Sequence, residues 1–92
     1  MKQLNLQKLQ NSLRKKFLKS GVKMIALDTI YFSKDTKVGK NVTIEPYVVI
    51  GPKVKIGNSV IIKSFSHLEN CRIENKVEIG PYARIRPGTI LK

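Results

Sequence analysis

The sequence predicts a mainly β protein, a parallel β-helix preceded by one amphipathic α-helix. Large apolar residues recur every six positions from Phe32 to Leu68, and after one five-residue step the spacing resumes from Ile73 to Leu91. Neither the 3.6-residue period of a helix nor the two-residue alternation of a strand produces this spacing. In a hexapeptide β-helix, six residues form one short strand and one corner, and the apolar residue points inward. Since three hexapeptides make one coil, residues 32–92 supply a little over three coils.

Other residue types follow the same period. Glycines directly follow four of the apolar positions, where we expect a tight corner with positive φ: Gly39, Gly51, Gly57 and Gly80. The four prolines stand two places after an apolar position, at corners where a missing N–H costs the strand ladder least. A small or β-branched residue comes four places after most apolar positions. The short step from Leu68 to Ile73 predicts one shortened corner.

The segment from Leu4 to Ser20 predicts an amphipathic helix. Its apolar residues are spaced by three, four and four positions and share one face: Leu6, Leu9, Leu13 and Phe17. Gly21 follows as a left-handed C-cap. A four-residue stripe without Trp favours docking on protein over lying on a membrane surface. We therefore divide the chain into a docking or linker helix (1–21), a connection (22–31) and a β-helix (32–92).

Composition limits the partners and the chemistry. The net charge of +12 ordinarily indicates nucleic acid or anionic lipid, but the basic residues do not form one stripe along the sequence, and aromatic residues do not alternate with them. We expect neither nucleic acid nor membrane as a partner. With no apolar run of about 18 residues and no signal-peptide pattern, we expect a cytoplasmic location. A single cysteine, Cys71, can form neither an intramolecular disulfide nor a cysteine metal site.

Two segments carry a more specific resemblance. An Ile, Leu or Val followed by Gly and four further residues is the pattern of the hexapeptide-repeat acyltransferases, whose coils wind left-handed, against the usual right-handed crossover. The stretches "IIKSFSHLENCRI" (61–73) and "IGPYARIRPGTIL" (79–91) resemble the early coils of the GlmU-type bifunctional enzymes. That family combines glucosamine-1-phosphate N-acetyltransferase and N-acetylglucosamine-1-phosphate uridylyltransferase activities and makes UDP-N-acetylglucosamine for the cell envelope. The upstream helix and "SGVKMIALDTIYFSKDTKVG" are similar to the family's linker between the two domains.

The resemblance implies a left-handed β-helix and one substrate-binding residue. Arg86, the second arginine of "ARIRPG", matches a family position that contacts the nucleotide sugar or the amino-sugar phosphate. A guanidinium suits phosphate oxygens, and Arg84 and Arg86 both flank the inward Ile85, so both side chains should point outward. His67, the only histidine, is not the family's catalytic one, and we expect a structural role at a corner.

We expect no catalytic residue, metal or cofactor in this chain. Its sequence begins in the linker helix, after the position of the family's nucleotide-binding loop, and ends six residues after Arg86, before the family's catalytic histidine. In the full-length family, acetyl-coenzyme A and Mg²⁺ take part.

Three hypotheses result. The first is a truncated relative, inactive alone and prone to aggregate or assemble because its last coil leaves a strand edge open. The second is a structural or regulatory β-helix subunit that trimerises and completes or modulates a longer acetyltransferase chain. The third is an acetyltransferase whose later coils come from a separately encoded fragment. Since so short a chain has a marginal core, a homotrimer or a complementary C-terminal fragment is the expected partner.

Overall fold

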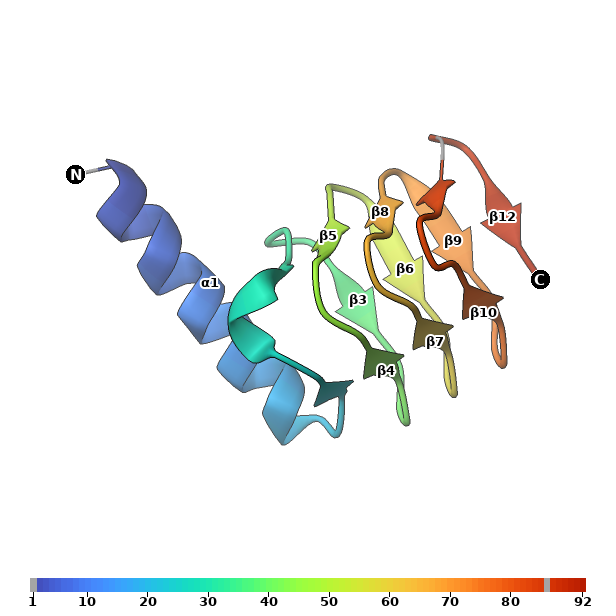
Figure 1. Cartoon of the computed structure of the whole chain (residues 1–92), viewed down its shortest axis with the longest axis horizontal. Helices are drawn as coiled ribbons and strands as arrows, with labels where there is room; N and C mark the ends of the chain where they lie inside the picture. The colour runs from blue at the N-terminus through green and yellow to red at the C-terminus, as the bar shows by residue number, and fades with distance from the viewer. Residues whose placement is uncertain (1, 86) are drawn as a thin grey trace.

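The computed structural model describes residues 2–85 and 87–92 of the chain. In this part, helix α1 (Lys2–Lys19) precedes twelve short strands and one 3₁₀ helix, η1 (Leu27–Thr29). The strands are β1 (Lys23–Met24), β2 (Ile30–Tyr31), β3 (Lys37–Val38), β4 (Thr43–Ile44), β5 (Val48–Ile50), β6 (Val54–Ile56), β7 (Ile61–Ile62), β8 (His67–Leu68), β9 (Cys71–Ile73), β10 (Glu78–Ile79), β11 (Arg84–Ile85) and β12 (Ile90–Leu91). Figure 1 shows α1 at one end of the stacked coils and the C-terminus at the other.

Three parallel four-stranded sheets form the sides of a triangular prism, because each sheet takes every third strand. The orders are β1-β4-β7-β10 (sheet A), β2-β5-β8-β11 (sheet B) and β3-β6-β9-β12 (sheet C). This arrangement confirms the prediction of a mainly β protein with one N-terminal helix and a parallel β-helix, here of about four turns.

The first turn lies partly within the connection, residues 22–31. It contains β1, η1 and β2, and β1 pairs with β4 so that Met24 lies opposite Ile44, 20 positions later. In the next turn the offset is 18 positions, from Ile44 to Ile62. The longer first turn explains why the six-residue period becomes visible only from Phe32.

The predicted shortened corner is present between β8 and β9. Before it, Val38 lies opposite Ile56, an offset of 18 positions, whereas Ile56 lies opposite Ile73, an offset of 17. One residue is therefore absent from that corner without any change in which side chains point inward.

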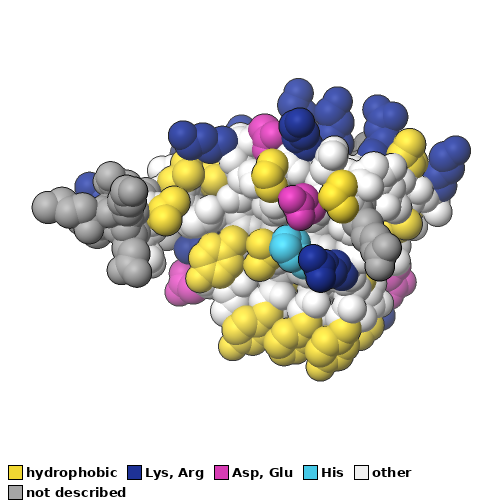
Figure 2. Space-filling view, turned by 90° about the horizontal axis from the view of Figure 1, so that it is seen from above, with side chains coloured by type: hydrophobic (Ala, Val, Ile, Leu, Met, Phe, Trp, Pro, Cys, Tyr) yellow, Lys and Arg dark blue, Asp and Glu magenta, His cyan; other side chains and the backbone are white. Residues whose placement is uncertain are grey.

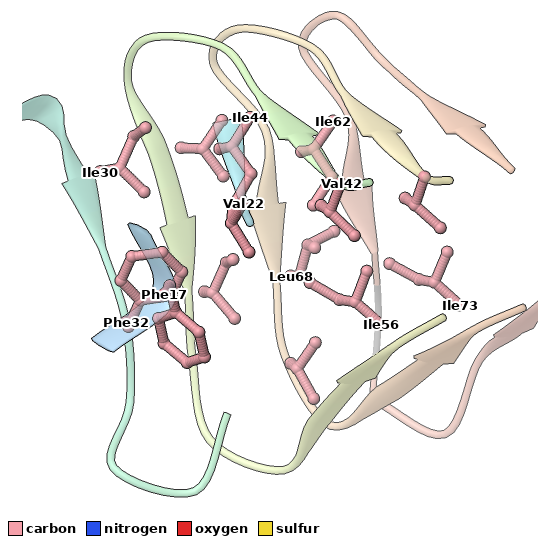
Figure 3. Close-up of a cluster of buried hydrophobic side chains, with 14 of the residues drawn as sticks. Phe17, Val22, Ile30, Phe32, Val42, Ile44, Ile56, Ile62, Leu68 and Ile73 are labelled. Carbon is pink, nitrogen blue, oxygen red and sulfur yellow. The ribbon is translucent and has the colours of Figure 1, made fainter. Parts of the chain in front are cut away.

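The apolar positions of the period fill the prism, as Figure 3 shows. Two kinds of position supply the fully buried side chains, the six-residue apolar positions and the β-branched positions four places after them. They include Ile44, Ile50, Ile62, Leu68 and Ile73 of the first kind and Val42, Val48, Val54 and Val60 of the second. Each such side chain contributes about 1.5–3 kcal/mol of burial free energy, so this interior is the main source of stability.

Left-handed backbone occurs at the corners, but mostly not at glycine. Positive φ is found at nine non-glycine residues: Ala26, Asn41, Tyr47, Lys53, Ser59, Phe65, Asn70, Lys76 and Tyr82. Of the four corner glycines only Gly80 has positive φ, at 82°. The prediction of positive φ at Gly39, Gly51 and Gly57 is therefore wrong, because the left-handed residue of a corner comes two places later.

Close approach between coils explains the glycine at position 57. A Cβ added there would lie 2.9 Å from the backbone nitrogen of Asn75 and 2.5 Å from its Oδ1. That Oδ1 accepts a hydrogen bond from the backbone N–H of Asn58 at 2.7 Å, and Asn58 Oδ1 accepts one from the N–H of Lys40 at 2.8 Å. The side-chain amides thus join successive coils where only glycine leaves room.

Helix α1 packs on the first turn through the C-terminal half of its apolar stripe. Leu13 and Phe17 are buried and Leu9 is partly buried, whereas Leu6 is 59% exposed. The ring centroids of Phe17 and Phe32 lie 4.6 Å apart. The helix therefore docks on the protein's own β-helix.

Polar contacts align the same helix with β2. Arg14 is buried, and its Nε and one terminal nitrogen donate hydrogen bonds to the backbone oxygens of Ile30 at 2.9 Å and Asp28 at 3.1 Å. The side-chain amide of Gln10 accepts a hydrogen bond from the backbone N–H of Phe32 at 2.8 Å and donates one to the backbone oxygen of Phe32 at 2.7 Å. The amide thus makes the two backbone hydrogen bonds that a residue of a neighbouring strand would make.

The helix ends as predicted. Gly21 has a φ of 95°, its N–H donates to the oxygen of Leu18, and the N–H of Val22 donates to the oxygen of Phe17. These two bonds define a Schellman motif, with Val22 buried against the core. Within the described residues, no helix is both long and apolar enough to cross a bilayer.

Candidate functional site

The outer face of sheet B presents the predicted arginine segment. Arg84 lies in β11 opposite His67 of β8, and His67 lies opposite Val49 of β5. The Arg84 side chain is exposed, while that of Ile85 is turned inward and partly buried. This is the outward direction predicted for Arg84. Arg86 lies outside the described residues, so its role stays a prediction.

A hollow with a volume of about 350 Å³ lies beside Arg84. It is lined by His67, Glu69, Arg84, Ile85 and Pro87. His67 lies in strand β8, so the expectation of a corner position is wrong. Its backbone N–H donates a hydrogen bond to the oxygen of Ala83 at 2.8 Å, which is part of the backbone hydrogen bonding between neighbouring coils.

The side chains of this hollow combine a cation, an anion and an imidazole. The Arg84 guanidinium can donate parallel hydrogen bonds to a phosphate, and the Glu69 carboxylate can accept from a hydroxyl or an ammonium group. Such a set suits a small ligand that carries both a phosphate and hydroxyl or amino groups. Sequence reasoning missed Glu69 and the alignment of His67 with Arg84. The 17-residue offset across the shortened corner was the signal that could have found the alignment.

Two titratable groups outside this hollow, Cys71 and Lys63, have raised pKa values with structural explanations. Cys71 is buried, and burial raises the pKa of its thiol above the ordinary value, which favours the unreactive neutral form. The hydrogen bond and the charge of Glu78, at 2.7 Å from Lys63, raise the pKa of the Lys63 ammonium group. In residues 2–85 and 87–92 no three His, Cys, Asp or Glu side chains are close enough together to hold a metal ion.

Comparisons with known proteins agree with the geometry. A family model described as bacterial transferase hexapeptide, with six repeats, matches residues 35–70. The bifunctional protein GlmU of Zymomonas mobilis is 51% identical over 79 residues, which cover 86% of this chain and 18% of that protein. The GlmU proteins of Azorhizobium caulinodans and Wolbachia pipientis are 47% identical over 83 residues and 45% identical over 82 residues. These alignments cover 90% and 89% of this chain, and 18% and 19% of those proteins.

The stacked coils, together with the match of residues 35–70 to the hexapeptide model, define the class of fold: this chain contains a hexapeptide-repeat β-helix. Its sequence is similar to that of GlmU proteins along nearly all of its own length. The chain spans less than a fifth of the length of the curated relatives it matches.

Proposed function

We propose that this chain supplies the linker helix and the first coils of an N-acetyltransferase that acts on an amino-sugar phosphate, glucosamine-1-phosphate, in the cytoplasm. The observation that carries the proposal is the 45–51% identity to GlmU proteins, which runs through both the helix and the coils described above. The same proposal holds that residues 1–92 do not acetylate this substrate by themselves.

The substrate phosphate is the proposed ligand of the arginine segment. Arg86 is the proposed contact, with Arg84 and His67 supplying further positive or donor groups on the outer face of sheet B. The hollow at Arg84, which also contains Glu69, supports this assignment because its groups complement a phosphate together with an amino or hydroxyl group.

Acetyl-coenzyme A and Mg²⁺ belong, in this proposal, to the full-length relatives. The described residues do not fit a magnesium site, because they bring no three metal-ligating side chains together. When bound, the coenzyme would supply the acetyl group. The described residues of this chain are proposed only to bind and orient the phosphate end of the acceptor.

A homotrimer is the proposed assembly. Hexapeptide-repeat β-helix domains typically trimerise. An exposed aromatic column between sheets A and B supports self-association: Tyr47 and Phe65 stack at a centroid distance of 5.2 Å, and Phe65 and Tyr82 at 5.0 Å. In Figure 2, hydrophobic side chains gather along one side of the molecule and Lys and Arg side chains along the opposite side. Copies that meet through this aromatic column keep their cations apart.

The alternative partner is a complementary C-terminal fragment, which would make this chain a structural or regulatory subunit.

The deciding experiment measures acetyl transfer. Residues 1–92 are assayed with glucosamine-1-phosphate and acetyl-coenzyme A, alone and mixed with the part of the Zymomonas mobilis relative that follows its aligned segment. We expect no turnover alone. Turnover in the mixture, lost in Arg86→Ala and kept in the Lys23→Ala control, would support both the fragment and the arginine assignment. Turnover by residues 1–92 alone would contradict the proposal.

A further inference from the structure

A column of basic side chains runs across the outer face of sheet C. Lys37 of β3 lies directly opposite Lys55 of β6, and Lys55 lies directly opposite Arg72 of β9. All three side chains are exposed. These residues are 18 and 17 positions apart, so they do not form a stripe along the sequence. The register of the coils brings them together.

Like charges directly opposite one another on neighbouring strands destabilise a sheet. Among the described residues the ion pair is Lys63 with Glu78, on sheet A, and none involves the column. One carboxylate, that of Asp35, lines the same hollow as the column, and it accepts a hydrogen bond from the backbone N–H of Lys53 at 3.0 Å. The three cations of the column therefore share their hollow with one carboxylate, and none of them is in a salt bridge among the described residues.

The column lines the floor of an open hollow. This hollow has a volume of about 470 Å³, and its polar lining adds Lys53, Asn70, Thr89 and the single carboxylate of Asp35 to the three cations. The first three of these side chains supply one more ammonium group and neutral hydrogen-bond donors around the column. The hollow therefore offers several donors to an anion lying across the strands.

We propose that this face binds a linear oligophosphate, whether free or as the phosphate chain of a nucleotide. Two strand spacings separate Lys37 from Arg72, about 10 Å, which is close to the length of a triphosphate. Arg72 can bind one phosphate with two parallel hydrogen bonds, and the two lysines act as point charges on the others. Bound phosphates offset the repulsion between the stacked cations.

Compact oligophosphates fit this face better than nucleic acid does. Single-stranded nucleic acids bind where bases stack on aromatic side chains along a basic groove. Within the described residues, no aromatic side chain lines the hollow, and the stacked rings of Tyr47, Phe65 and Tyr82 lie at the corner between sheets A and B. The proposed ligand is therefore inferred from the charges of the hollow, without a contribution from aromatic stacking.

The test uses the 92-residue chain and sodium tripolyphosphate in isothermal titration calorimetry at low ionic strength. We expect one triphosphate per chain, and about tenfold weaker binding in Lys55→Gln, since a hydrogen bond to a charged group contributes about 1.5–3 kcal/mol and 1.4 kcal/mol is a factor of ten. Lys23→Gln is the matched control, because Lys23 is also exposed on a strand but lies opposite Thr43. Circular dichroism checks that both variants fold, and Lys55→Arg, which keeps the charge, should retain binding.

The outcomes separate the alternatives. Adenosine triphosphate that binds as tightly as tripolyphosphate, or more tightly, would support a nucleotide as the source of the phosphates. Equal weakening in Lys55→Gln and Lys23→Gln would overturn the site, because the effect would then be that of net charge. An oligothymidylate that binds more tightly than tripolyphosphate would also overturn it. None of these results depends on acetyl transfer or on Arg86.

Discussion

At the corner that contains Gly57, two coils are held together by side-chain amides that bind backbone N–H groups. Asn75 Oδ1 binds the N–H of Asn58, and the glycine hydrogen leaves the space in which that amide lies. Here the glycine serves close approach, since its φ is not positive. Corner conformation and corner packing are thus separate requirements, met by different residues two places apart.

Gly57→Ala tests this at the residue scale. The added methyl group would meet the backbone of Asn75, which cannot move without separating the coils, so we expect a loss of about 1–3 kcal/mol in the free energy of unfolding. Urea denaturation measures the loss. Lys23→Ala, at an exposed strand position, should change the unfolding free energy by less than about 0.5 kcal/mol. A Gly57→Ala variant as stable as this control would show that the corner has room for a side chain.

At the scale of elements, the junction between α1 and the β-helix depends on a buried arginine. Arg14 is 3% exposed, and carbonyl oxygens of Ile30 and Asp28 accept its hydrogen bonds. Its guanidinium also lies over the ring of Tyr31, 5.1 Å from the centroid. The guanidinium holds its donors in a rigid plane that reaches both carbonyls while it stacks on the ring, whereas the ammonium group of a lysine is a compact point charge without this planar geometry.

Arg14→Met should therefore loosen the helix. The substitution leaves the buried carbonyl of Ile30 and the partly buried carbonyl of Asp28 without this donor, at a cost of about 1–3 kcal/mol for the buried one and less for the other, and Arg14→Lys should restore less than half of the loss. Thermal unfolding followed by circular dichroism gives the difference. Lys15→Met, at the next and exposed position, is the control. The contact assignment would be wrong if Arg14→Met and Lys15→Met unfolded at the same temperature.

For the whole molecule, the main feature is that the basic column and the aromatic column lie on different faces of the prism. Sheet C presents the basic column, and the corner between sheets A and B presents Tyr47, Phe65 and Tyr82. Since the chain has a net charge of +12, copies can associate closely only where their cations do not meet. The aromatic corner meets that condition.

Phe65→Ser should accordingly weaken the proposed trimer. Phe65 is the central ring of the aromatic column and is 51% exposed, so its loss removes apolar contact area with little effect on the core. Sedimentation velocity over a range of protein concentrations should show a shift toward monomer of at least tenfold in dissociation constant. The control is Ile90→Ser, an exposed apolar residue on sheet C. An unchanged Phe65→Ser trimer, or equal weakening by Ile90→Ser, would place the interface elsewhere.

The β-helix, its inward residues and the shortened corner could all be predicted from the amino-acid sequence. The six-residue period is a local pattern, and it identifies inward residues such as Ile44, Ile62 and Leu68 without knowledge of which coils lie side by side. The end of α1 at Gly21 was also predictable, because a Schellman motif is made by neighbouring residues. For the candidate site, the sequence predicted the outward direction of Arg84, while the role of Arg86 remains a prediction.

Which outward residues lie next to one another depends on how the coils stack in three dimensions. The partner of a side chain on the next coil depends on the number of residues in that turn, which is 20 from Met24 to Ile44, 18 in regular turns and 17 across the short corner. For that reason the pairing of Arg84 with His67 and the column Lys37, Lys55 and Arg72 form no local pattern in the sequence, and only the lengths of the turns relate them. The close approach at Gly57 likewise arises between coils. Inward packing follows from local periodicity, whereas the outer faces follow from the register between turns.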